Sequence, residues 1–231
     1  MEPTGLRERK KARTRRHIAD TAARLFAEHG YEQVTVADVA QAAEVAEQTV
    51  YNYFGTKEQL VTDREEQIRD RLCELIRTRP AGATPAAAIR EFVLTGVQGI
   101  RGVPENQWPG ELGHLAAISP TVHRLALELT ARQADALTEA ITATSAVPPE
   151  IARLQGIALA GVFQIIITDT GRRTAEGQNQ KQIADELHPA VARVLDELDH
   201  WFAVSEPTTW CAGTSRGARP GTAGSPTDPS G

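Results

Sequence analysis

The sequence has few of the residues that build sheets, disulfide frameworks or membrane spans. Only 5% of its 231 residues are aromatic, and no segment alternates apolar and polar residues as a half-buried strand does. Its two cysteines, Cys73 and Cys211, are too few for a disulfide framework. The longest apolar run, residues 156–167, is shorter than the roughly 18 residues that cross a bilayer. These absences predict an all-α protein of the cytoplasm that does not associate with membranes.

Motifs that carry catalysis or bind metal ions are also missing. The chain contains no GxSxG motif, no phosphate-binding loop and no cluster of metal ligands. His114 and His123 are nine residues apart, a spacing that does not place both on one helical face. We therefore expect no enzyme activity, no cofactor and no metal. An all-α enzyme or carrier with a degenerate DNA-binding motif is an alternative class.

Positive charge is concentrated near the N-terminus, although the net charge of the chain is −5. Residues 7–16 (RERKKARTRR) contain seven basic side chains and one acidic one, and residues 61–231 carry the whole negative excess. A basic segment on an acidic protein indicates one surface that faces a polyanion. The alternative is a solvated, frayed terminus.

Apolar residues recur at helical spacing along most of the chain. Thr35 and Thr56 stand where side chains can cap helices, and Gly30 stands where the first helix ends. The pattern predicts helices at about residues 9–29, 36–43, 47–54, 57–79, 89–100, 111–118, 120–141, 151–170 and 181–202.

Breaks between these segments predict the domain organisation. We expect a small N-terminal domain with a helix-turn-helix at residues 8–56 and a larger helical domain at residues 57–204. The remainder, residues 205–231, is rich in Gly, Pro, Ser and Thr, and we expect it to be disordered.

The helix expected at residues 47–54 has an outward face suited to reading DNA. Val50 and Phe54 share its inward side, whereas Gln48 and Asn52 point away from them. Amide and hydroxyl groups can exchange hydrogen bonds with base edges in the major groove. The alternative is a pair of short helices in an unrelated bundle, in which Tyr51 and Tyr53 are half-buried anchors.

A longer motif surrounds this helix. The run T-x-x-x-VA-x-A starts at Thr35, the run V-x-x-x-TVY-x-YF-x-x-KE-x-L ends at Leu60, and a Gly-Tyr pair precedes both at residues 30–31. Together they resemble the N-terminal domain of the TetR family of transcriptional regulators, over about residues 10–60. The resemblance implies a homodimer that places two recognition helices in successive major grooves of a palindromic operator in double-stranded DNA. It also implies a small-molecule effector, of unknown identity, that releases the DNA and usually relieves repression.

The resemblance assigns roles to individual side chains. Positions where the family reads bases hold Gln48, Thr49 and Asn52, and positions where it grips phosphates hold Thr35, Tyr51, Tyr53 and Lys57. Two residues depart from the family pattern. Glu44 replaces the usual glycine of the turn, so either Glu44 takes a left-handed backbone conformation at a cost of roughly 1 kcal/mol, or the turn differs slightly from that of the family. Ala46 replaces a serine cap, which removes a bond of about 1 kcal/mol.

The second domain offers candidates for an effector pocket between its helices. Gln164 lies inside an apolar helix and needs a hydrogen-bond partner, which is either a ligand or a neighbouring side chain. The candidate lining residues are Phe92, Gln98, Trp108, His114, Leu125, Phe163, Gln164 and Ile167.

Two helices of this domain carry more apolar surface than one chain can readily bury. The functional interpretation is a dimer interface of two helices from each subunit, which the resemblance also implies. The alternative is a monomeric core. The candidate interface residues are Ile157, Gly161, Ile165, Val191, Val194, Leu198 and Trp201. If the second domain serves dimerisation alone, the chain is a ligand-independent DNA-binding protein.

Overall fold

The structure, a computed structural model, describes residues 5–103 and 112–205. Within these residues it contains helices and no strands, which confirms the all-α prediction. Trp108 and the tail beyond Ser205 lie outside the described residues. The α-helices are Leu6–His29 (α1), Val36–Ala42 (α2), Glu47–Tyr53 (α3), Lys57–Arg77 (α4), Pro85–Gly99 (α5), Leu112–Ile118 (α6), Pro120–Thr142 (α7), Pro149–Ala175 (α8) and Gln180–Ser205 (α9).

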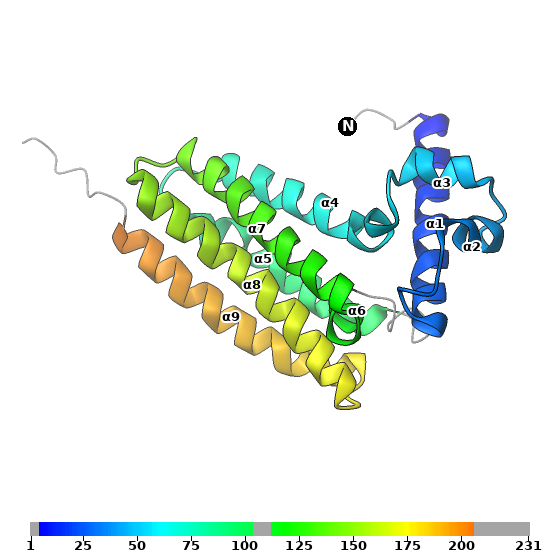
Figure 1. Ribbon diagram of the computed structural model, residues 1–231. Helices are drawn as coiled ribbons and strands as arrows, with labels where there is room; N and C mark the ends of the chain where they lie inside the picture. The colour runs from blue at the N-terminus through cyan, green and yellow to red at the C-terminus, as the bar shows by residue number, and fades with distance from the viewer. Residues whose placement is uncertain (1–4, 104–111, 206–231) are drawn as a thin grey trace, which may run out of the picture.

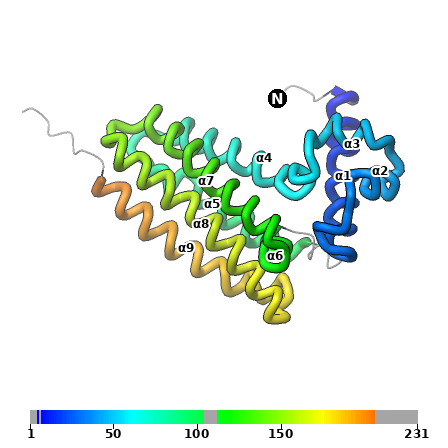
Figure 2. The backbone as a smooth tube through the Cα atoms, viewed as in Figure 1, coloured from blue at the N-terminus to red at the C-terminus, as the bar shows by residue number. Residues whose placement is uncertain are grey.

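The helices form a small head and a long bundle (Figure 1). The head consists of α1, α2 and α3 and lies at one end of the molecule. From the head, α4 runs along the bundle, where α7 packs on α8, and α9 packs on both α5 and α8. The tube view shows the short α6 at the end of the bundle that faces the head (Figure 2). The head and the effector domain expected from the sequence are thus linked through more than α4.

Side-chain caps fix the starts of several helices. Thr35 forms a capping box with Asp38 at the start of α2, and the Thr56 hydroxyl accepts a hydrogen bond from Gln59 N at the start of α4. Thr84 and Ser119 cap α5 and α7 in the same way. Both caps expected from the sequence are therefore present. Gly30 ends α1 with φ 83°, a backbone conformation that favours glycine.

Two hydrophobic cores hold the molecule together, and one of them crosses from the head into the bundle. The head core is built on Ile18, Phe26, Val50 and Phe54, but it continues without a break into Leu115 of α6. It also includes the first turns of α7. The second core lies inside the bundle. The corner between α6 and α7 therefore packs as part of the head.

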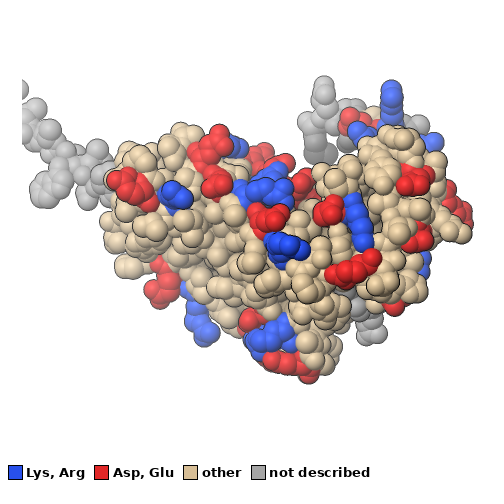
Figure 3. Space-filling view, in the orientation of Figure 1, with Lys and Arg blue, Asp and Glu red and all other residues tan. Residues whose placement is uncertain are grey.

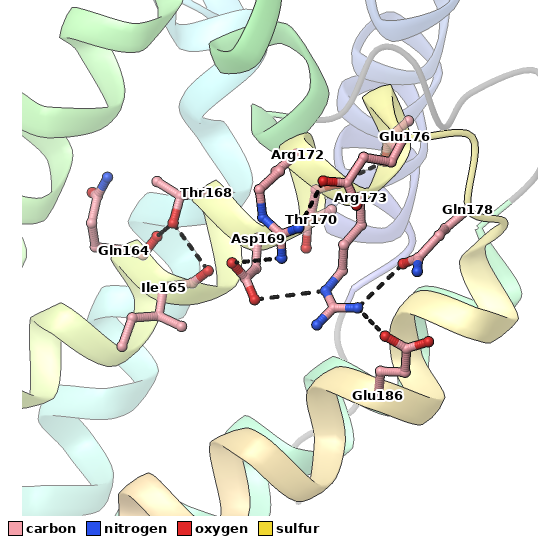
Figure 4. Close-up of polar contacts among 11 residues, drawn as sticks. Gln164, Ile165, Thr168, Asp169, Thr170, Arg172, Arg173, Glu176, Gln178 and Glu186 are labelled. Atoms are coloured by element: carbon pink, nitrogen blue, oxygen red, sulfur yellow. Dashed lines mark hydrogen bonds and ion pairs between the residues drawn. The ribbon is translucent and has the colours of Figure 1, made fainter.

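The last turns of α8 correct a prediction. The polar stretch from Gly171 onward was expected to separate two helices, yet α8 continues to Ala175. Two ion pairs lie at the extension (Figure 4): Arg172 of α8 bonds Glu176, the residue after the helix, at 2.8 Å, and Arg173 bonds Glu186 of α9. Charges that look solvated in the sequence thus stabilise the helix end and join it to α9.

Among the described residues, α8 is the one helix that is long and apolar enough to cross a membrane by length and composition. The longest apolar run, residues 156–167, is too short to cross a membrane, but the whole of α8 is longer than this run. Core helices of water-soluble proteins pass the same test, and part of α8 is buried against α7 and α9. The test is therefore weak evidence for a membrane span.

Candidate nucleic-acid interface and ligand cavity

The turn between α2 and α3 adopts the strained conformation expected from the sequence. Glu44 has φ 54°, the one positive φ at a non-glycine residue in the described parts of the chain. Val45 N donates to Ala40 O at 3.0 Å, which closes the turn. Ala46 provides no side-chain cap for α3. The helix-turn-helix thus forms despite both departures from the family pattern.

The outward face of α3 is free. Val50 and Phe54 are fully buried in the head core, which fixes the rotation of the helix. Gln48 and Asn52 are exposed on the opposite side, where Gln48 Nε2 donates to Asn52 Oδ1 at 3.2 Å. This bond aligns two amides one helical turn apart, and each retains groups for a base edge. Thr49 lies half-buried beside them.

The four residues predicted to contact phosphates differ in their exposure and in the bonds that they already make within the protein. Tyr51 is 43% exposed, whereas Tyr53 is half-buried against the head core. The Thr35 hydroxyl already donates to the Asp38 carboxylate at 2.6 Å, so a phosphate must compete with that bond. Lys57 Nζ lies 4.2 Å from the centre of the Tyr31 ring, and burial lowers the pKa of Lys57. The ring holds Lys57 beside the start of α4.

Arg15 differs from the rest of the basic segment at residues 7–16, because its guanidinium is bound within the protein. Its Nε lies 3.0 Å from both carboxylate oxygens of Asp63 on α4, and its Nη1 donates to Tyr53 O at 2.7 Å. The guanidinium also stacks 4.7 Å from the centre of the Phe54 ring. Arg15 therefore joins α1, the end of α3 and α4. It is a structural residue, because its donors are occupied inside the protein.

Charges of both signs are mixed on the visible surface. In Figure 3, basic and acidic side chains alternate over the bundle and the adjoining side of the head. On this face there is no broad surface of one sign.

An apolar cavity of about 470 Å³ lies between α4, α5, α6 and α8. Its buried floor is formed by Val93, Val97, Leu112, Gly113, Phe163 and Thr170. Its rim includes exposed residues of α5, among them Thr95. The volume and the lining are those of a site for a small molecule.

Three of the predicted pocket residues, Phe92, Phe163 and Ile167, line this cavity. Gln98 lies elsewhere, with Nε2 at 3.1 Å from His188 Nε2 on α9. Gln164 accepts a hydrogen bond from the Thr130 hydroxyl at 2.6 Å, so a neighbour satisfies it. His114 and Leu125 are also outside the lining, and Trp108 is outside the described residues.

Gly113 and Thr170 are among the floor residues that the sequence did not single out. A Cβ on Gly113 would lie 2.9 Å from Ile167 O, so α6 approaches α8 closely at this point. The available signal was a glycine in each of the two helices, because Gly171 packs on Gly113 O in the same contact. Small residues allow helices to approach, but nothing local in the sequence tells which pair meets.

All but one of the predicted dimer residues are at least partly exposed on α8 or α9. Ile157 and Ile165 are 49% and 44% exposed on α8, and Gly161 between them has no neighbour within 4 Å of a Cβ position. Val194, Leu198 and Trp201 are half-buried on α9. Val191 is 2% exposed and packs in the core of its own chain, so it is unavailable to a partner.

Comparison with known proteins agrees with the geometry of the head. Residues 18–63 match the family model of bacterial regulatory proteins, tetR family. The chain is 34% identical over 106 residues to the HTH-type transcriptional regulator TcmR of Streptomyces glaucescens, covering 41% of this chain and 47% of TcmR. It is 31% identical over 98 residues to the probable acrEF/envCD operon repressor of Escherichia coli K12, covering 41% and 44% of the two chains.

These matches span less than half of each curated relative. A solved structure extends the likeness in fold to most of the chain. NalD, the secondary repressor of the MexAB-OprM multidrug efflux pump in Pseudomonas aeruginosa, superposes with a TM-score of 0.51 at 20% identity over 79% of this chain and 97% of NalD. By the sequence and geometry of residues 18–63, the N-terminal domain of the chain belongs to the tetR family of bacterial regulatory proteins.

Proposed function

We propose that the protein is a dimeric, sequence-specific DNA-binding regulator of transcription, and that it acts as a repressor released by a small-molecule effector. The observation that carries the proposal is the exposed pair Gln48 and Asn52 on a helix whose opposite side is fixed in the head core. Relatives named as a transcriptional regulator and as a probable operon repressor match this same region. The site of action is then the cytoplasm.

The exposed stripe on α8 supports the dimer. Leu154, Ile157 and Ile165 are each 44–51% exposed, and Gly161 lies between them on the same helical face. Covering these side chains with the same stripe of a second chain removes apolar surface from water. Two heads related by a two-fold axis then read two half-sites about 34 Å apart on a palindrome.

The position of Leu112 supports the proposal that a ligand controls DNA binding. Leu112 lines the cavity floor, and it also belongs to the head core, as does Leu115. A molecule that prefers a shifted position of α6 would therefore move the head relative to the bundle. DNA affinity would fall by the difference in the ligand's affinity for the two positions, and by no more. An open cavity favours this proposal over a ligand-independent DNA-binding protein, whose core would be filled.

Selection of purified protein on a random DNA library tests the DNA-binding proposal. We expect a palindrome whose half-sites change preference at defined positions in Gln48→Ala and Asn52→Ala, each base contact contributing about 1–3 kcal/mol of discrimination. Lys181→Ala, exposed at the far helix α9, is the matched control and should select the wild-type palindrome. Failure of the wild-type protein to enrich any sequence contradicts the proposal.

A further inference from the structure

Glu47 places a free carboxylate on the helix that is proposed to read DNA. It is the first residue of α3, its side chain is exposed, and among the described residues it forms no hydrogen bond or ion pair. Other carboxylates near this helix are held within the protein. Asp38 accepts from the Thr35 hydroxyl at 2.6 Å. Asp63 of α4 accepts from Arg15 Nε at 3.0 Å. The Glu47 carboxylate, by contrast, is available to a partner outside the chain.

The packing of α3 fixes the direction in which Glu47 points. Val50 and Phe54 are fully buried in the head core, so the helix cannot rotate about its axis without losing that packing. Glu47 lies one helical turn before Tyr51, which is 43% exposed, and directly before the exposed Gln48. The first residues of a recognition helix contact base edges when the helix lies in the major groove. Glu47 therefore borders the surface that carries the exposed amides.

The chemistry of a carboxylate restricts what Glu47 can bind in DNA. Phosphate oxygens repel it and offer no hydrogen, so its partner must be a donor on a base edge. In the major groove, cytosine presents the amino group at N4, whereas guanine presents N7 and O6 and thymine presents O4, all of them acceptors. Adenine carries the acceptor N7 beside its amino group. A carboxylate therefore favours cytosine and disfavours guanine and thymine.

We propose that the Glu47 carboxylate accepts a hydrogen bond from the N4 amino group of a cytosine in each half-site, and so determines specificity at a base pair that Gln48 and Asn52 do not read. This inference rests on the proposed function, because it adds a base contact to the same DNA-reading helix. Repulsion between Glu47 and the phosphates lowers affinity for all DNA, and the bond to cytosine compensates for it only in the matching sequence. Glu47 therefore contributes more to discrimination than to affinity.

Selection from a random DNA library with four full-length proteins tests the inference: the wild type, Glu47→Gln, Glu47→Ala and Glu44→Gln. We expect the wild-type half-site to contain a cytosine whose preference is lost in Glu47→Ala. In Glu47→Gln the preferred base at that position should change to adenine, which a glutamine amide bonds at N6 and N7. In fluorescence anisotropy, replacing the cytosine base pair should weaken wild-type binding about fivefold to 150-fold and should weaken Glu47→Ala binding by less than about twofold.

Glu44→Gln is the matched control, because Glu44 is an exposed carboxylate in the turn before α3. Removal of either charge should raise affinity for unrelated DNA, but Glu44→Gln should leave the preferred base at every position unchanged. A change of the same base in Glu44→Gln would overturn the inference, because loss of charge alone would then explain the effect. A palindrome that both Glu47 variants select unchanged would overturn the inference and leave the proposed function standing. Enrichment of no sequence by the wild type would overturn both.

Discussion

The Ser119 hydroxyl donates a hydrogen bond to the Glu32 carboxylate, and this bond lowers the pKa of Glu32. Glu32 lies in the turn after α1 in the head, and Ser119 caps α7 by accepting from Val122 N at 3.1 Å. One side chain therefore both starts a bundle helix and attaches the head to it. The head core also extends into α6 and the first turns of α7. The corner between α6 and α7 is therefore a second connection between head and bundle, in addition to α4.

The Glu32–Ser119 contact should appear as a coupling free energy. We expect a double-mutant cycle of Glu32→Ala and Ser119→Ala to give about 0.5–1 kcal/mol, the net value of one partly exposed hydrogen bond. Urea unfolding of the four proteins measures it. The matched cycle of Glu28→Ala with Ser119→Ala joins residues that do not bond each other and should give a coupling near zero. Equal values in the two cycles would contradict the attachment.

Removing Arg15 should loosen the end of the recognition helix. Arg15→Ala removes the donor to Tyr53 O and leaves the Asp63 carboxylate with the Gln67 amide as its donor, and we expect a loss of about 1–2 kcal/mol of unfolding free energy, reduced by partial exposure. Denaturant unfolding measures this loss. Arg24→Ala removes only an exposed pair with Glu28 and should cost less than about 0.5 kcal/mol. A cost for Arg15→Ala no larger than that of the control would show that the contacts are not stabilising.

Two glycines of α8 should respond oppositely to alanine. A Cβ at Gly156 would lie 2.8 Å from Ala134 O on α7, so Gly156→Ala should destabilise the chain by about 1–3 kcal/mol. Gly161 faces open space, and Gly161→Ala should stabilise the helix by about 0.5–1 kcal/mol. Thermal unfolding compares the two. If α8 pairs closely with a second copy, Gly161→Ala should also weaken dimerisation in sedimentation equilibrium, and an unchanged dimer constant would argue against close approach there.

His114 should make the protein sensitive to mild acid. Burial lowers its pKa, and its Nδ1 is buried without a partner. The unfolded chain therefore binds a proton more readily than the folded chain, so stability is complete above the unfolded pKa of about 6.5 and falls as the pH drops below it. We expect His114→Phe to flatten unfolding free energy against pH between about 7 and 5. His123→Gln, at an exposed position, should retain the wild-type slope.

Lys57 should contribute to binding of every DNA sequence alike. Lys57→Gln removes one charge at the start of α4, and we expect weaker binding to the selected palindrome and to unrelated DNA. The slope of log affinity against log salt should become shallower by about one for each subunit that loses a phosphate contact. Fluorescence anisotropy at several salt concentrations measures it, with Lys181→Gln as control. An unchanged slope would mean that Lys57 serves the Tyr31 ring and not a phosphate.

Features set by neighbours in the sequence were predictable. Threonine caps at residues 35 and 56 depend on amides three residues later, and the inward side of α3 depends on the spacing of Val50 and Phe54. The positive φ of Glu44 was expected from the family resemblance, in which a glycine usually occupies this turn position. Such signals act within one or two turns, so the order of the helices and the outward face of α3 could be expected from the sequence.

Features that depend on contacts between distant residues were not predictable from the sequence. In the sequence, Arg15 belongs to the basic segment that is expected to face DNA. In the structure, its guanidinium donates to Asp63, which lies 48 residues away in the sequence. Val191 and Ile157 have the same apolar character in the sequence, yet packing buries the first and exposes the second. Gly113 of α6 lies against the methyl group of Thr170 on α8, a contact between residues 57 positions apart in the sequence. The sequence alone determined the helices and the outward face of α3 through local hydrogen bonding and periodicity. Only the tertiary structure decided the cavity, the free side chains and the second connection to the head, because these depend on which helices pack together.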